Sequence, residues 1–129
     1  MNRRPVSVLR CFAGDLPLGL AADEVLAFHA ILPAQPHIAA LLGVAPGPPH
    51  AGQRTLSLAG GDQQVLVNVD GPVKIRALGG SDILRLPRFF IPGALSPLLG
   101  FAEEDGRVVL LLDVPSVSRL ARGALQGKS

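Results

Sequence analysis

Residues 98–113 constrain the fold most, because they encode a strand, an acidic turn and a second strand in direct succession. Asp105-Gly106 favours a tight hairpin, since both residue types tolerate a positive φ angle. Residues 108–112 form an unbroken apolar run, which is typical of a strand covered on both faces. We therefore expect this hairpin to lie deep in the core, with the rest of the chain around it.

The remaining chain predicts mostly β structure, with about seven short strands separated by turn signals, as in a barrel or sandwich. Outside the hairpin, strands are predicted over residues 5–12, 16–20, 54–59, 63–70 and 73–77. The second of these contains Pro17, which cannot donate to a ladder, so it is an edge strand or a strand start. Asp70-Gly71-Pro72 is expected to break or bulge the chain, and residues 21–28 fit either a helical turn or a strand.

Two short helices are expected. Residues 36–43 begin with proline and end with glycine, and residues 115–122 follow Asp113, which caps the helix itself or precedes the capping residue. A short helical turn is also expected at 81–84, an irregular stretch at 86–97, and a frayed tail from Gly123. The Pro- and Gly-rich residues 45–53 read as a linker between a first lobe, about 1–44, and a second, about 54–122, within one domain of 129 residues.

Composition limits the function classes. The chain has five Phe and no Trp or Tyr, which argues against stacking platforms for bases or sugars. Its net charge of +2 comes from dispersed residues rather than from a basic stripe, so no nucleic-acid partner is expected. Its single cysteine, Cys11, is interpreted as a buried structural thiol, and no apolar run approaches the ~20 residues that span a bilayer. A cytoplasmic protein is expected.

No catalytic, metal or cofactor residues are predicted. The histidines, His29, His37 and His50, are far apart in sequence, unlike zinc ligands. The Gly-Gly doublets lack the lysine and hydroxyl of a phosphate loop, and the carboxylates of residues 103–105 read as a solvated turn. Lys74 and Arg76 on the outer face of a strand suit either an acidic partner or plain solvent.

Taken together, these pieces resemble the CheW-like domain of bacterial chemosensory systems, most strongly over residues 54–122. The segments that carry the resemblance are Val65 to Ile75, Leu86-Pro87, Leu99-Gly100-Phe101, and Asp105 to Val114. Upstream, residues 12–26 are similar to the family's opening hairpin, and residues 38–43, ending in Leu-Leu-Gly, to the helix that closes its first half. The resemblance implies two small SH3-like barrels and a non-catalytic adaptor that joins chemoreceptors to a histidine kinase.

The chain departs from the family between these two elements. The family has a Gly-x-x-x-Leu-Arg-Gly segment and a strand there, whereas this chain runs almost directly from Ile31-Leu32-Pro33 to the helix. The first lobe is therefore expected to be reduced or completed by a partner, with an exposed strand edge. The partner-binding residues that the resemblance suggests are Asp23, Glu24, Val25 and Phe28 in the first lobe and Val73, Lys74, Ile75 and Arg76 in the second.

Two alternatives remain open. A divergent relative that binds another regulatory protein without coupling receptors would show the same sequence features. A small β-barrel enzyme or ligand-binding protein would instead need a pocket with convergent polar groups.

Overall fold

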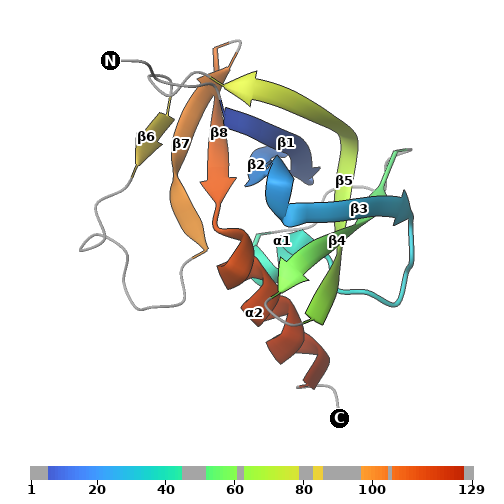
Figure 1. The fold of residues 1–129 in the computed structure, drawn as a ribbon. Coiled ribbons are helices and arrows are strands. Elements are labelled where there is room, and N and C mark those ends of the chain that lie inside the picture. The colour runs from blue at the N-terminus through green and yellow to red at the C-terminus, as the bar shows by residue number, and fades with distance from the viewer. Residues whose placement is uncertain are drawn as a thin grey trace.

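The computed structural model describes residues 6–44, 52–60, 63–78, 83–85, 97–104 and 106–126 (Figure 1). The strands are β1 (Val6–Ala13), β2 (Leu16–Ala21), β3 (Val25–Ala30), β4 (Arg54–Gly60), β5 (Gln63–Leu78), β6 (Ile83–Arg85), β7 (Leu98–Glu104) and β8 (Arg107–Leu112). They form a sheet in the order β3-β4-β5-β1-β2-β8-β7-β6. The helices are α1 (Ile38–Leu42) and α2 (Val114–Gln126), and a 3-10 turn, η1 (Ala22–Glu24), links β2 to β3. The predicted class, mostly β with two helices, is confirmed.

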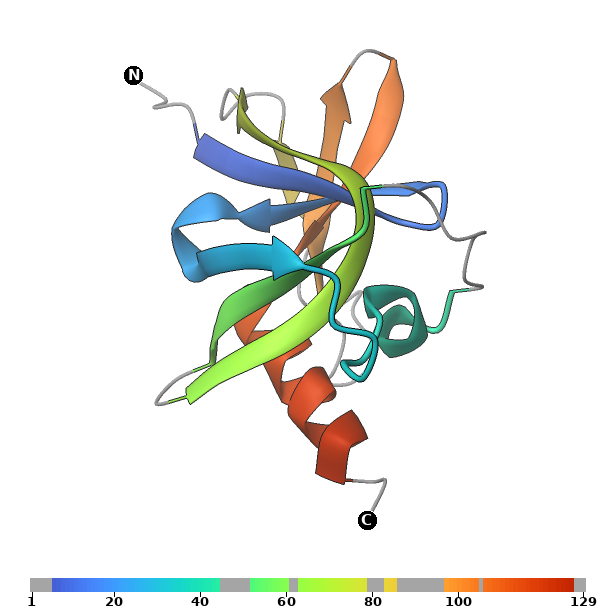
Figure 2. The same cartoon turned by 90° about the vertical axis from the view of Figure 1, so that its right-hand side faces the viewer.

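The long strand β5 curves from β4 at one end to β1 at the other (Figure 2). Its residues 63–69 pair with β4, and residues 70–78 face β1. The predicted irregularity near Pro72 is a bulge, because the register shifts between Arg10 and Phe12 of the facing strand. The prediction of a separate strand over 73–77 is wrong. Pro72 has no N–H to donate, but it lies where the ladder has already shifted, so the strand continues through it.

The β1–β2 hairpin lies at the centre of the sheet. Its turn contains Gly14 at φ 63°, a conformation that glycine adopts without strain. On its other side β2 pairs in parallel with β8, with Leu20 opposite Leu112. Of the two predictions made for Pro17, the strand start is confirmed, because β2 begins one residue before it. The prediction of an edge strand is wrong, because β2 lies between β1 and β8 in the sheet.

The two sequence segments on either side of the predicted linker share the sheet. The first segment's β3 pairs with β4 of the second, and its β1 pairs with β5 of the second. The linker itself, apart from residues 52–53, lies outside the described residues, as does the irregular stretch from 86 to 96 with its Leu86-Pro87. The division into two lobes stays a prediction.

The main core lies where α1 and α2 pack with the strands. Buried aliphatic side chains from β1, β2, α1, β4, β5 and α2 meet there, among them Leu9, Leu20, Ile38, Leu56, Val67, Val69, Val114 and Val117. The β7–β8 hairpin reaches this core at Leu112, whereas Leu99 and Val108 are 50% and 57% exposed. The expectation that the hairpin is covered on both faces is therefore wrong for its outer part, since no described segment packs over Val108.

The capping of α2 follows the sequence. Asp113 Oδ2 accepts hydrogen bonds from the backbone N–H and the hydroxyl of Ser116, which satisfies a free N–H of the first turn. Two local predictions fail. Ile83 and Leu84 belong to β6, because they pair with Ala102 and Phe101 of β7, and α2 continues past Gly123 to Gln126 instead of fraying there.

Candidate functional site

The connection from β3 to α1 replaces the strand that the family resemblance leads one to expect. It spans residues 31–37 without a strand of its own. Asn68 of β5 holds it: its backbone N–H donates to Pro36 O at 2.8 Å, and its Nδ2 donates to Leu32 O at 2.9 Å and Gln35 O at 3.2 Å. Thr55 of β4 donates to Asn68 Oδ1 and accepts from the Leu32 N–H at 2.8 Å. The polar groups of β4 and β5 are thus satisfied by a short loop rather than by a further strand.

This arrangement leaves β3 exposed. Among the described residues β3 pairs with β4 alone, so its outer edge offers unpaired backbone groups. All of its residues after Val25 are exposed, including Leu26 at 53% and Phe28 at 54%. Ile31 and Leu32 continue this apolar surface at 37% and 42%. An exposed apolar edge strand is a template for pairing with another chain, and natural proteins usually protect it.

A pocket of about 320 Å³ lies beside this edge. Its lining residues are Phe28, Gly52, Arg54, Pro72 and Val73. Its surface is partly polar, and we call it the apolar pocket after its three apolar side chains, those of Phe28, Pro72 and Val73. It brings together Phe28 and Val73, one predicted partner-binding residue from each half of the sequence. β4, which lies between β3 and β5 in the sheet, aligns these two strands, so the pocket follows from strand order rather than from any local motif.

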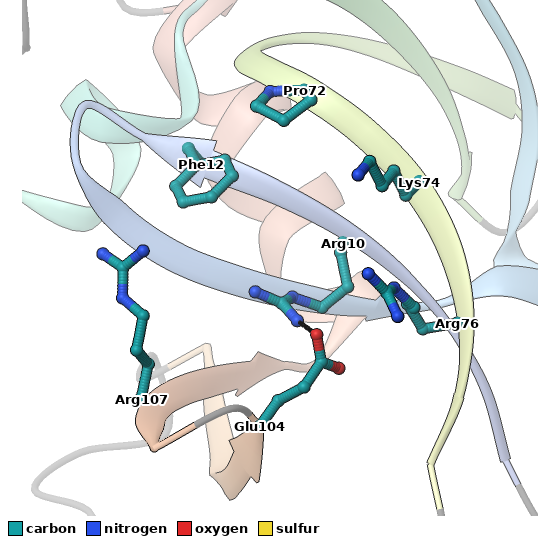
Figure 3. Close-up of a pocket in the computed structure, with 7 residues that line it drawn as sticks. All are labelled: Arg10, Phe12, Pro72, Lys74, Arg76, Glu104 and Arg107. Carbon is teal, nitrogen blue, oxygen red and sulfur yellow. Dashed lines mark hydrogen bonds and ion pairs between the residues drawn. The ribbon is translucent and has the colours of Figure 1, made fainter.

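A second, basic pocket of about 170 Å³ lies across β1, β5 and the β7–β8 hairpin (Figure 3). Its lining residues are Arg10, Phe12, Pro72, Lys74, Arg76, Glu104 and Arg107. Arg10 pairs with Glu104, and both side chains are largely buried, at 12% and 16% exposed. Two predicted residues, Lys74 and Arg76, therefore lie in this pocket. Pro72 lines both pockets, so the basic pocket adjoins the apolar one.

The other predicted residues lie outside both pockets. Asp23 and Glu24 are in η1, and Val25 packs partly against the core. Burial raises the pKa of Glu24, and the nearby carboxylates of Asp23 and Asp113 raise it further. Ile75 is 61% exposed on β5. Four of the eight predicted residues thus line the two pockets and four do not, so they do not form one continuous site.

Sequence reasoning missed Arg10, Glu104 and Arg107. Arg10 reads in sequence as one member of an alternating strand, and its role depends on register, since it lies directly opposite Lys74. Glu104 reads in sequence as part of a solvated turn, and no role is predicted for Arg107. Glu104 pairs with Arg10, and Arg107 lines the same pocket, because the β7–β8 hairpin lies next to β2 in the sheet. The one signal in the sequence is an arginine between apolar residues in a buried strand, which requires a charged or polar partner.

A buried polar cluster around Asp70 joins the β1–β2 turn to α1. Asp70 accepts from the Gly14 N–H at 2.6 Å and from Gln53 Nε2 at 2.8 Å, and His37 Nε2 lies 3.2 Å from its carboxylate. Burial raises the pKa of Asp70, but the hydrogen bonds from Gln53, Gly14 and His37 outweigh it and hold the pKa below its ordinary value. His37 Nδ1 also accepts from the Ala39 N–H and so caps α1. His37 therefore has a structural role in the described part of the chain.

Cys11 should be inert in the folded protein. Burial raises the pKa of its thiol to about 12, so almost no thiolate forms at neutral pH. We expect native protein to resist alkylation by iodoacetamide, and protein unfolded in guanidinium chloride to react fully, as measured by intact-mass spectrometry. Rapid alkylation of the native protein would show that the β1 strand opens far more often than its complete burial implies.

Other site classes find little support in the described part of the chain. It contains no group of three or more metal-ligating side chains. His29 is exposed on β3, neither pocket includes His29 or Asp113, and His50 lies outside the described residues. No helix among the described residues has the length and apolar character needed to cross a membrane.

Comparison with solved structures identifies the fold. The scaffolding protein TtCheW from Thermoanaerobacter tengcongensis, a crystal structure, superposes with a TM-score of 0.69 at 13% sequence identity. The match covers 88% of this chain and 92% of that chain. The chain therefore has a CheW-like fold, as the sequence resemblance predicts. No family model matches the sequence, and no curated protein matches it.

Proposed function

We propose that this protein is a non-catalytic adaptor in bacterial chemosensory signalling, which binds a histidine kinase, a chemoreceptor or both. The observation that carries the proposal is the apolar pocket at the β3 edge, where Phe28 and Val73 meet in a CheW-like fold. TtCheW is itself described as a scaffolding protein. Exposed apolar side chains next to an unpaired strand edge suit a protein partner, which covers the side chains and pairs with the edge.

The short β3–α1 connection favours a narrower version of this proposal. Residues 31–37 take the place of the strand and arginine that the family resemblance associates with receptor docking. A protein that keeps the fold but has this edge uncovered is suited to bind one partner through β3. The kinase is then the expected partner, and receptor coupling is lost. If the protein binds neither the kinase nor the receptor, the alternative is that it binds another regulatory protein.

Capture of these partners tests the proposal. We expect the folded protein to bind the regulatory domain of a chemosensory kinase from the same genome at micromolar concentration in titration calorimetry. Leu26→Ser with Phe28→Ser should weaken binding at least about tenfold, because truncating anchors in an interface commonly costs more than a kcal/mol each.

The matched control is Leu99→Ser with Val108→Ser, which removes equally exposed apolar side chains from the β7–β8 hairpin. It should bind as the unaltered chain does, while far-UV circular dichroism shows that both variants are folded. Equal loss of binding in both variants would remove the β3 edge as the docking site. Failure of the folded protein to retain either kinase or receptor would contradict the adaptor proposal.

A further inference from the structure

The basic pocket beside the β3 site has an unusual concentration of like charge. Four cationic side chains, those of Arg10, Lys74, Arg76 and Arg107, line it together with the one carboxylate of Glu104. Arg10 and Lys74 are directly opposite each other on neighbouring strands, a position at which like charges destabilise a sheet. Figure 3 shows the side chains of Arg10 and Arg76 side by side, with Glu104 reaching Arg10 from the hairpin. The repulsion between these cations destabilises the free protein, and an anion that enters the pocket would relieve it.

Arg10 is the group best placed to receive that anion. Its side chain is 12% exposed and pairs with Glu104, while its Nε is buried and has no hydrogen-bond partner within the described residues. A guanidinium holds a carboxylate through two parallel N–H donors, so a second carboxylate can compete with Glu104 for it. Glu104 thus serves as a stand-in for the ligand in the free protein.

The size and surroundings of the pocket define the kind of ligand. At about 170 Å³ it is smaller than the ~300–1,000 Å³ of typical small-molecule sites. It offers one aromatic side chain, Phe12, and no row of cations that could follow a phosphate backbone. It adjoins the apolar pocket through Pro72, which lines both. A polypeptide that runs past Pro72 can therefore contact both pockets.

We propose that the basic pocket receives an aspartate or glutamate side chain from an acidic segment of the protein partner that docks on the β3 edge. This inference rests on the proposed adaptor function, which supplies the protein partner. It adds to that function that the segment of the partner bound here is acidic. The apolar pocket supplies contact area, and the basic pocket supplies selectivity, since a neutral or basic segment would leave Lys74, Arg76 and Arg107 without a counterion.

Synthetic peptides test the charge requirement without knowledge of the partner. A fluorescein-labelled peptide of alternating leucine and glutamate should bind, by fluorescence anisotropy, about tenfold more tightly than its leucine–glutamine counterpart. Added salt should reduce this difference, because the cations at the rim are screened. Lys74→Glu with Arg76→Glu should abolish it. Equal affinity of the two peptides, or tighter binding of a short single-stranded DNA, would overturn the proposal.

The matched control is Arg119→Glu with Arg122→Glu, which changes the net charge by the same amount on α2 and should keep the preference for glutamate. Loss of the preference in both variants would mean attraction to net charge alone. Glu104→Gln should bind the leucine–glutamate peptide more tightly, and unchanged or weaker binding would contradict the role given to Arg10. Inorganic phosphate that shifts the nuclear magnetic resonance signals of Lys74 and Arg76 when the peptide does not would show a small-anion site instead.

The two proposals fail separately. If the kinase domain binds but its affinity does not change with Lys74→Glu and Arg76→Glu, the adaptor function stands and the acidic segment is wrong. If the peptide preference holds while neither kinase nor receptor is retained, the pocket stands and the partner is a different protein with an acidic segment.

Discussion

Asn68→Asp should lower the free energy of unfolding by about 3 kcal/mol, although the two side chains have nearly the same shape. Asn68 is 5% exposed, and its Nδ2 donates to the carbonyl oxygens of Leu32 and Gln35. A carboxylate oxygen at that position cannot donate and would face both carbonyls from a buried site. Asn68→Ala removes the same hydrogen bonds without adding a charge, so its loss should be smaller, about 2 kcal/mol.

Urea unfolding followed by far-UV circular dichroism measures these differences, since the chain has no Trp or Tyr for fluorescence. Gln63→Glu, the same amide-to-carboxylate change at an exposed position of the same strand, is the control and should cost less than about 0.5 kcal/mol. Hydrogen exchange should show faster exchange of the Leu32 amide in Asn68→Asp. A variant as stable as the unaltered chain would mean that the β3–α1 connection is not held by Asn68.

The hydrogen bonds of Asn68 also bear on function, because they fix the position of β3. The connection over residues 31–36 leaves the sheet immediately after Ala30, and the hydrogen bonds to Asn68 and Thr55 fix its path. Without a further strand in this segment, these side chains determine where β3 ends and which backbone groups stay unpaired. The end of β3 therefore has a fixed position without a covering strand, because one polar residue on β4 and one on β5 satisfy the backbone groups of the connection.

Local features of the fold could be predicted from sequence. The β1–β2 and β7–β8 hairpins follow from Gly14 and from Asp105-Gly106, and the α2 cap follows from Asp113, because each depends on residues that are close in the chain. The continuity of β5 could not be predicted in this way. Whether a proline ends a strand depends on the register of the facing strand, which no local pattern contains.

In the candidate site, too, single residues could be predicted from sequence, but the way in which they come together could not. Phe28 and Val73 could be named from the resemblance, and Lys74 and Arg76 also from their place on the outer face of a predicted strand. That Phe28 and Val73 meet in one pocket, and that Arg10 joins Lys74 in another, depends on the strand order β3-β4-β5-β1. The covering of the β7–β8 hairpin was overestimated for a related reason: an apolar run such as residues 108–112 shows that burial is favourable, but not whether another segment is there to provide it.

Asp70→Asn should lower the free energy of unfolding by about 3 kcal/mol at neutral pH. The carboxylate of Asp70 accepts from Gly14, Gln53 and His37 at once, and its side chain is 3% exposed. An amide has one acceptor oxygen, and its NH₂ would face a donor, so at least one buried N–H loses its partner. The loss extends beyond the strand, since Gly14 shapes the β1–β2 turn and His37 caps α1.

The pH dependence of the free energy of unfolding shows whether the charge of Asp70, rather than the loss of packing, accounts for the effect of Asp70→Asn. The pKa of Asp70 in the folded protein lies below its ordinary value, so the folded state favours the charged form. Its contribution is complete above the pKa of an unfolded aspartate, about 3.9, and is lost as the pH falls through the lower pKa of the folded state. The stability gap between Asp70→Asn and the unaltered chain should therefore be wide at neutral pH and narrow towards about pH 2. Asp15→Asn, at an exposed position in the same turn, is the control and should be as stable as the unaltered chain at every pH. If the stability difference between Asp70→Asn and the unaltered chain stayed constant with pH, the charge of Asp70 would not be what holds the cluster together.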